Sequence, residues 1–104
     1  MFSKEQLNKE VLEAMHQTYV DKNSDYGDSF EKTRAKYPTA ILIRLNDKLS
    51  RLEILMGGQE QKVLDESIND TLIDLANYAV MEYMERKIDE VYLQGYNERV
   101  TTKE

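Results

Sequence analysis

The chain has 104 residues, of which 40% are hydrophobic and 33% are charged, a composition that suits one small domain with a modest core. Its formal net charge of −6 argues against general binding to nucleic acid, because affinity for the phosphate backbone comes from clustered Lys and Arg. The absence of cysteine excludes disulfides, cysteine-based zinc sites and thiol catalysis. The single histidine, His16, excludes a zinc site built on several imidazoles, and we expect it to be a surface or packing residue.

Long helices inside one domain are the expected organisation. No stretch approaches the roughly 18 to 20 consecutive apolar residues of a membrane span, and the opening MFSKEQLNKE lacks the segments of a secretory signal, so we expect a cytoplasmic protein without a membrane partner. One proline and four glycines indicate helices with few interruptions. We expect a single all-α domain over residues 1–104, with the polar tail after Gly95 as a candidate for fraying.

The first helix is predicted over about residues 4–21. Ser3 followed by Gln6 forms a weak capping box at its start. The apolar residues Leu7, Val11, Leu12, Met15, Tyr19 and Val20 then recur at helical spacing. Asn, Ser, Asp and Gly in KNSDYGDSF, residues 22–30, interrupt this pattern and predict a loop.

Two helical segments follow the predicted loop. A short piece over about residues 29–36 is expected to end ahead of Pro38, because the residue before a proline disfavours helical geometry. A longer helix is predicted over about residues 39–56, since proline is tolerated in a first turn, and Gly57 with Gly58 provides its stop.

The last helix is predicted after the polar turn GGQEQK. It starts near Val63 or Leu64 and meets no breaker before Gly95, although a kink or a separate final helix over about residues 86–93 is an alternative. The fold class is therefore all-α, a small bundle of three to four helices with a central antiparallel pair.

The two central helices carry polar stripes. In the first of them the polar stripe comprises Arg44, Asp47, Lys48 and Arg51, and the apolar face comprises Ile41, Leu45, Leu49, Leu52 and Leu55. In the second the polar stripe comprises Glu66, Asn69, Asp70, Asp74 and Asn77, and the apolar face comprises Leu64, Ile68, Leu72, Leu75 and Ala79. Because a short turn makes the two helices antiparallel neighbours, we expect the polar stripes to face each other across a cleft.

The acids of DESINDTLIDLANYAV carry an energetic cost. Glu66, Asp70 and Asp74 are spaced by four, and like charges at this spacing destabilise an isolated helix by roughly 0.2 to 0.5 kcal/mol per pair. Asp in the middle of a helix also lowers helix propensity. Short carboxylates that converge from adjacent turns suit Mg²⁺ or Mn²⁺, which prefer oxygen ligands. The alternative interpretation is a solvated face, the usual position of charged residues.

Three blocks occur in the order KNSDYGDSF, IRLNDKLSRLEIL and DESINDTLIDLANYAV. This combination resembles the small phage and bacterial family called nucleotide modification associated domain 1, over roughly residues 20–85. More distantly, the two helical blocks resemble the MazG-type all-α nucleoside triphosphate pyrophosphohydrolases, whose usual pattern is an E-x-x-E on one helix and an E-x-x-D on the next.

The chain departs from the MazG-type pattern at two points. Asp47 stands at an acidic position of the first motif, but Ser50 or Arg51 stands where a second acid is expected. Glu66 and Asp70 are spaced by four, where the second motif has a spacing of three.

The resemblance implies metal-assisted attack of water on the α-phosphate of a nucleotide, which releases pyrophosphate and a monophosphate. It implies Asp47, Glu66 and Asp70 as ligands of Mg²⁺ or Mn²⁺, with Asp74 as an outer ligand or a base that positions water. The residues expected to bind phosphate are Arg44, Lys48 and Arg51. The alternative interpretation pairs these basic side chains with Asp47, Glu66 or Asp70 in a buried ionic network without metal.

The predicted loop also has two interpretations. In the functional one, Tyr26 stacks on a base and Lys22 reaches phosphate, while Asp25 or Asp28 reads base edges. In the structural one, the loop is an ordinary turn in which Gly27 supplies a positive φ.

Three classes of function remain open. The first is a Mg²⁺-dependent nucleotide pyrophosphohydrolase or a closely related nucleotide-processing enzyme, the second is a protein that binds or sequesters a nucleotide without hydrolysis, and the third is an acidic helical phage protein that inhibits a host partner. Apolar residues after Asn77 extend around more than one face of the last helix, namely Tyr78, Val80, Met81, Tyr83 and Met84. We therefore expect a homodimer or tetramer.

Overall fold

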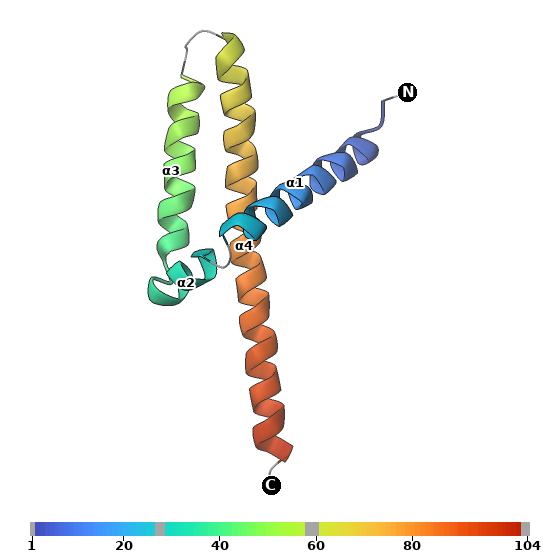
Figure 1. Cartoon of the computed structure of the whole chain (residues 1–104), viewed down its shortest axis with the longest axis vertical. Helices are drawn as coiled ribbons and strands as arrows, with labels where there is room; N and C mark the ends of the chain where they lie inside the picture. The colour runs from blue at the N-terminus through green and yellow to red at the C-terminus, as the bar shows by residue number, and fades with distance from the viewer. Residues whose placement is uncertain (1, 27–28, 58–60, 103–104) are drawn as a thin grey trace.

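Four α-helices make up the computed structural model of the chain (Figure 1). They are α1 (Lys4–Tyr26), α2 (Ser29–Lys36), α3 (Ala40–Leu55) and α4 (Gln61–Thr102). The structure describes the backbone of residues 2–26, 29–57 and 61–102, and the side chains of residues 2–23, 29–57 and 67–95. No strand occurs in these backbone ranges, so the predicted all-α fold is confirmed. None of the described helices combines the length and apolar character needed to cross a membrane.

The antiparallel pair of α3 and α4 forms the centre of the fold, as predicted (Figure 1). α3 packs along the N-terminal half of α4, and α1 crosses α4 near its middle. The N-terminal half of α1 and the C-terminal half of α4 project away from the pair. The radius of gyration is 18.2 Å, whereas a compact chain of this length would have about 13 Å. The single chain is therefore open and elongated.

Capping explains where α1 begins, and a tertiary contact explains where it ends. The backbone N–H of Gln6 donates to Ser3 Oγ at 3.3 Å, so the Ser3 half of the predicted capping box is formed, whereas the Gln6 side chain donates to Glu10 at 3.2 Å. α1 then runs on to Tyr26, past the end predicted at residue 21. Lys22, in the last turns, pairs with an acid of α4, and this contact favours helix in a polar segment of weak intrinsic propensity.

α3 begins and ends where the sequence predicts. Thr39, directly after Pro38, is its N-cap residue. The backbone N–H of Gly57 donates to the Ile54 carbonyl at 3.3 Å just past its end. A Cβ at Gly57 would lie 3.0 Å from the Glu53 carbonyl oxygen, so the tight end of the helix favours glycine.

α4 is one long helix. It begins at Gln61, slightly ahead of the predicted start, and continues without interruption through residues 86–93 and Gly95. The alternative of a separate final helix is therefore wrong. Fraying of the tail stays a prediction, because the side chains after Gly95 lie outside the described residues.

Two polar contacts fix the register of α3 against α4. Lys48 Nζ lies 3.4 Å from Asp74 Oδ2, and Arg51 Nε donates to Thr71 Oγ1 at 3.2 Å. A step of three residues along α3 matches a step of three residues back along α4, as antiparallel packing requires. The Thr71 hydroxyl in turn donates to the carbonyl of Ser67 at 2.6 Å, so both of its hydrogen-bonding roles are used.

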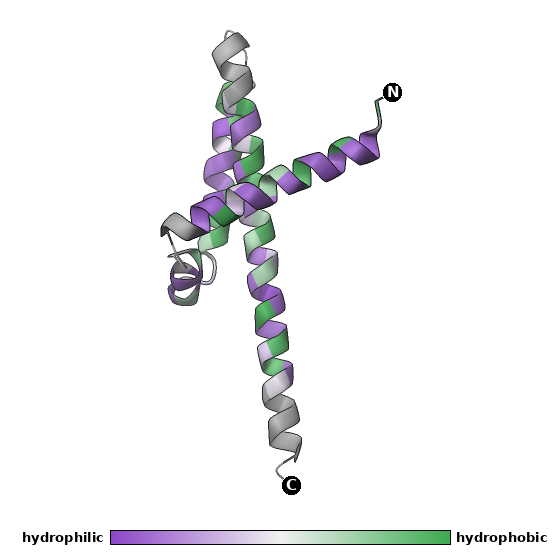
Figure 2. Ribbon diagram, turned by 45° about the vertical axis from the view of Figure 1, so that its right-hand side comes forward, coloured by the Kyte–Doolittle hydropathy of each residue, from purple (hydrophilic) through white to green (hydrophobic). Residues whose placement is uncertain are grey.

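The buried face of α4 differs from the predicted apolar face. Ile41 and Leu52 are the buried apolar side chains among the described residues, and both belong to the predicted face of α3. On α4, however, Thr71 and Glu82 are buried while Leu72 is exposed. Neighbouring residues of a helix point about 100° apart, so the register that turns Thr71 toward α3 turns Leu72 away. Figure 2 shows apolar residues along the projecting parts of α1 and α4 as well as in the central pair.

An ion pair fastens α2 to α4. Arg34 Nε and Nη2 donate to the two carboxylate oxygens of Glu82 at 3.0 and 3.2 Å, and Arg34 Nη1 donates to Asp89 at 3.0 Å. The hydrogen bonds from Arg34 lower the pKa of Glu82, and they outweigh the opposing effect of burial. This bidentate contact accounts for the burial of a carboxylate in a small fold.

Replacing Glu82 by Gln is expected to lower the free energy of unfolding at pH 7 by about 1.5 to 3 kcal/mol, the range for hydrogen bonds to charged groups. Because the pKa of Glu82 is depressed from 4.5, its contribution is present above that pH and is lost as the pH falls through the folded-state value. Urea unfolding followed by circular dichroism, at one protein concentration and several pH values, measures both effects.

Arg86 provides the matched control for this experiment. It donates to the same carboxylate at 3.0 Å, but its side chain is 71% exposed. Arg86→Ala is therefore expected to cost less than about 1 kcal/mol. Equal losses for Arg86→Ala and Glu82→Gln would contradict the assignment, and so would a loss for Glu82→Gln that does not shrink as the pH is lowered and this carboxyl becomes protonated.

The hydroxyl of Thr71 is expected to stabilise the α3–α4 register. Thr71→Val keeps the shape of the side chain but removes both hydrogen bonds, which lowers the free energy of unfolding by about 1 kcal/mol. Thr18 is the control, because its hydroxyl also bonds a carbonyl one turn back, that of Ala14, at 3.1 Å. No arginine donates to it in the described structure, so Thr18→Val should change stability by less than about 0.5 kcal/mol. A larger loss for Thr18→Val than for Thr71→Val would refute the register role.

Candidate functional site

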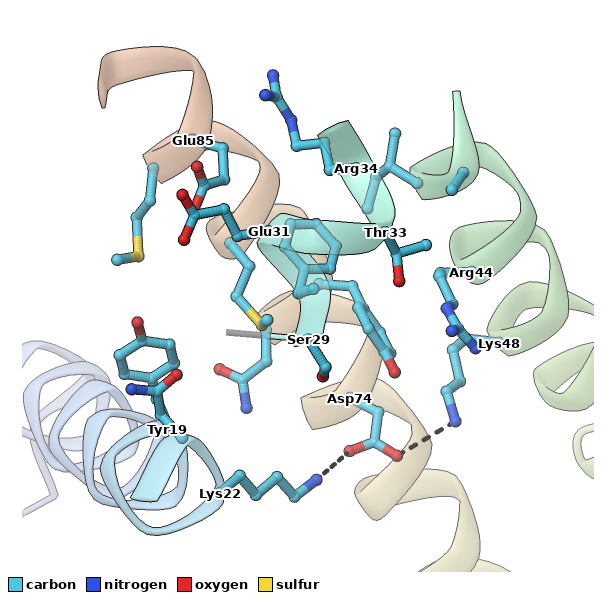
Figure 3. A pocket seen from close by; sticks show the side chains of 18 residues that line it. Tyr19, Lys22, Ser29, Glu31, Thr33, Arg34, Arg44, Lys48, Asp74 and Glu85 are labelled. Carbon is cyan, nitrogen blue, oxygen red and sulfur yellow. Dashed lines mark hydrogen bonds and ion pairs between the residues drawn. The ribbon is translucent and has the colours of Figure 1, made fainter. Parts of the chain in front are cut away.

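A cavity of about 480 Å³ opens where all four helices meet (Figure 3). α1 contributes residues from its last turns, α2 contributes its first turns, α3 its N-terminal half and α4 its middle. Only the last turns of α1 line this space, because α1 crosses α4 instead of packing along the central pair. The volume lies in the range of small-molecule sites.

Two lysines converge on one carboxylate at one side of the cavity. Lys22 Nζ of α1 lies 3.4 Å from Asp74 Oδ1, and Lys48 Nζ of α3 lies 3.4 Å from Asp74 Oδ2. Figure 3 shows the carboxylate of Asp74 between the two ammonium groups. The cluster joins three helices and carries one more positive charge than negative charge.

Arg44 adds a further cation one turn before Lys48 on α3. Among the described side chains, no acid forms an ion pair with it. Arg34 also lines the cavity, but its guanidinium is held by Glu82 and points away from the two lysines (Figure 3). Lys22, Arg44 and Lys48 therefore form the cationic side of the cavity, and we call them the cationic cluster.

Aromatic and thioether side chains form another part of the wall. The rings of Phe30 and Tyr78 have centroids 6.3 Å apart and planes tilted by 43°, and Tyr19 joins them from α1. Met81 and Met84 continue this wall along α4. The amide side chains of Asn23 and Asn77 supply donors and acceptors beside it. An apolar wall, a few amides and a cationic side suit a ligand with a planar ring and an anionic group.

The structure brings part of the predicted site together. Arg44, Lys48 and Asp74 line the cavity, as the facing of the two polar stripes predicts. Lys22, which was predicted to reach phosphate from a loop, also lines the cavity, but from the last turns of α1. Lys48 pairs with Asp74, and among the described side chains it does not pair with Asp47 or Asp70, which the ionic-network alternative named. The side chains of Tyr26 and Glu66 lie outside the described residues, so their predicted roles stay predictions.

Three other predicted site residues do not line the cavity. Arg51 donates to Thr71 and so holds α3 against α4. Asp47 and Asp70 are exposed and lie away from the cavity wall. His16, as expected, is a surface residue, exposed on the projecting part of α1.

The described acids do not fit a divalent cation. No group of three or more His, Asp or Glu side chains gathers within the described residues, and both oxygens of Asp74 face lysines. A bound Mg²⁺ at that position would meet two ammonium groups, which is electrostatically unfavourable. The predicted ligand set of Asp47, Glu66 and Asp70 includes a side chain outside the described residues and stays a prediction.

Several residues of the site were not identified from the sequence. Phe30 lies in the segment KNSDYGDSF, in which the sequence prediction assigns stacking to Tyr26 alone. Tyr78 was counted with the surplus apolar residues of the last helix. Arg34 and Glu82 carry no local signal, because they lie on separate helices that only the tertiary fold brings together.

Comparison with known proteins gives one family match. The family described as nucleotide modification associated domain 1 matches residues 22–85. Apart from Tyr19, every residue that lines the cavity falls within this segment. No curated protein and no solved structure matches the chain. The more distant MazG-type resemblance stays a prediction. Because the match spans more than half of the sequence, the chain belongs to the nucleotide modification associated domain 1 family.

Proposed function

We propose that the cavity binds a nucleotide and that the protein processes or sequesters nucleotides in phage or bacterial metabolism. One observation carries this proposal: two lysines from different helices converge beside an aromatic wall, in a cavity built almost entirely from the family segment. The description of the family, which refers to nucleotide modification, supports the same ligand class.

The cationic cluster would receive the phosphates. Lys22, Arg44 and Lys48 supply three cations from two helices, and a guanidinium can contact two phosphate oxygens at once. While no anion is bound, Asp74 keeps the two lysines in position, because each ammonium group contacts one oxygen of its carboxylate. A phosphate that approaches the cluster gains contacts with lysines that are already positioned, which lowers the cost of ordering them.

The aromatic wall would receive the base. Phe30, Tyr78 and Tyr19 offer ring faces, and stacking of a base on an aromatic side chain contributes about 1 to 3 kcal/mol. The amides of Asn23 and Asn77 can donate to and accept from base edges. The predicted role of Tyr26 in stacking belongs to the same proposal.

Removing one lysine of the cluster is expected to weaken nucleotide binding. Lys22→Ala and Lys48→Ala each delete one charged contact to phosphate, so the dissociation constant should rise by about 10- to 100-fold. Isothermal titration calorimetry with the common ribo- and deoxyribonucleoside triphosphates, at fixed ionic strength, measures this change.

Lys36→Ala is the control, because Lys36 is an exposed lysine of α2 that does not line the cavity. The dissociation constant of the Lys36→Ala variant for each triphosphate should stay within about twofold of that of the unsubstituted protein. Equal weakening by Lys36→Ala would show that net charge, and not the cluster, drives binding. If no triphosphate binds the unsubstituted protein, the proposed function is wrong.

Hydrolysis with Mg²⁺ or Mn²⁺ is the catalytic form of this proposal. The family resemblance and the acidic stripe support it. Its predicted ligands are Asp47, Glu66 and Asp70, of which Asp47 and Asp70 lie away from the cavity wall, and Asp74 is predicted to position water. A metal ion would polarise the phosphate and activate the attacking water. Sequestration without hydrolysis is the second form, and the pairing of Asp74 with two lysines favours it.

Product analysis after incubation with each triphosphate and Mg²⁺ or Mn²⁺ separates the two forms. Monophosphate and pyrophosphate, reduced by about 100-fold or more in Glu66→Gln and Asp70→Asn, are expected for a metal-dependent hydrolase. Binding without products indicates sequestration. If the substitutions leave turnover unchanged, the metal assignment fails, and if neither binding nor turnover occurs, a helical inhibitor of a host partner becomes the better hypothesis.

A homo-oligomer is also part of the proposal. The buried apolar side chains of the described chain are Ile41 and Leu52, and large apolar residues are exposed on α1, α3 and α4. A core of this size gives little stability to a chain that must order more than a hundred residues.

A further inference from the structure

The isolated chain exposes more surface than a compact protein of its mass. Its accessible surface is 8948 Å². A folded monomer of 12.2 kDa exposes about 6,100 Å². The excess, about 2,900 Å², is comparable to what one protomer buries in a large obligate dimer. The chain thus exposes as much excess surface as one protomer of a large obligate dimer would bury.

One face of α4 carries apolar residues in a regular pattern, while the exposed Val80, Tyr83, Tyr92 and Leu93 of the same helix lie off it. Met81, Met84, Ile88, Val91 and Gly95 of α4 follow one another at alternating spacings of three and four residues. This is the heptad spacing of a coiled-coil seam. The exposed fraction rises along the helix, from 37% at Met84 to 69% at Val91. We call these five residues the seam of α4.

The seam lies on the part of α4 that projects from the bundle (Figure 1). α3 packs along the other half of the helix, and α2 reaches α4 through Arg34 on a different face. The other projecting arm, the N-terminal half of α1, carries a similar exposed row in Leu7 and Val11. Two apolar arms on one chain suit a two-fold interface, in which each arm of one copy packs on the other copy.

A second copy of the chain is the occupant that these facts favour. A seam with heptad spacing is complementary to an identical seam, since knobs of one helix enter the holes of the other. The surface excess is of the size that such an obligate interface needs. We propose that a second copy of this chain packs on the seam of α4 and closes the side of the cavity next to Met84.

The link to the cavity comes from two shared residues. Met81 and Met84 belong both to the cavity wall and to the seam. A partner helix laid along the seam therefore borders the cavity and excludes water from its open side. This second part of the inference rests on the proposed nucleotide binding, whereas the interface itself does not.

Single cysteines test the interface directly, because the chain has none of its own. Val91 and Ile54 are almost equally exposed in the single chain, at 69% and 72%, but only Val91 lies on the seam. We expect the thiol of Val91→Cys to react with a neutral maleimide at least about tenfold more slowly than that of Ile54→Cys, and to speed up on dilution as the dimer dissociates. Sedimentation of the same samples gives the mass.

Equal reaction rates together with a monomeric mass would overturn the proposal and leave the seam to a different partner. Protection of Ile54→Cys instead of Val91→Cys would overturn it as well, because the copies would then meet through α3. These measurements require no ligand, so the test does not depend on the proposed function. Cysteine is also a mild substitution for Val91 and Ile54, so both variants are expected to fold.

A charge on the seam tests the link to the cavity. Ile88→Glu should raise the dimer dissociation constant by about tenfold or more and should weaken binding of the triphosphates in parallel. Ile54→Glu is the matched control and should change neither. Dissociation without any loss of nucleotide affinity would refute closure of the cavity while the interface stands. A dimer with a protected Val91→Cys that binds no triphosphate would refute the proposed function instead.

Discussion

The position of Asp74 is the constraint on which the site depends. Its two oxygens receive one lysine from α1 and one from α3, so a single carboxylate of α4 relates three helices to one another. The pair with Lys48 also sets the register of the central helices, together with the hydrogen bond from Arg51 to Thr71. Exposed ion pairs contribute little stability one at a time. Here, their effect is geometric, because they decide which side chains face the cavity.

Lysines of neighbouring helices offset part of the like-charge repulsion among the acids of α4. Like charges spaced by four destabilise a helix unless cations offset them. For Asp74 the cations are lysines. Asp70 instead remains exposed, where water screens its charge. Of the described acids of the stripe, Asp74 therefore joins helices and Asp70 faces solvent. Glu82, which lies outside the stripe, is paired with Arg34, whose hydrogen bonds lower the pKa of that carboxyl.

The open shape of the chain and the chemistry of the cavity have a common origin. α1 crosses α4 instead of lying along it, and this crossing leaves a cavity with mixed aromatic and cationic walls. The same crossing leaves two helical arms with apolar rows that the single chain does not cover. We propose a nucleotide as the ligand of the mixed walls and a second copy of the chain as the partner of the arms. Met81 and Met84 take part in both, so ligand binding and self-association are coupled in this proposal.

The sequence by itself determined the helices, the central antiparallel pair and the family. Few prolines and glycines, a proline at the start of α3 and a glycine at its end act through local backbone geometry, so they can be interpreted without a structure. The polar stripes also placed Arg44, Lys48 and Asp74 correctly in one cleft, because helical spacing and antiparallel packing leave few arrangements. Only the tertiary structure decided that α1 extends to Tyr26, that Arg51 bonds Thr71, and that Arg34 fastens to Glu82. These features depend on the rotation of one helix against another, and contacts between distant parts of the chain set that rotation.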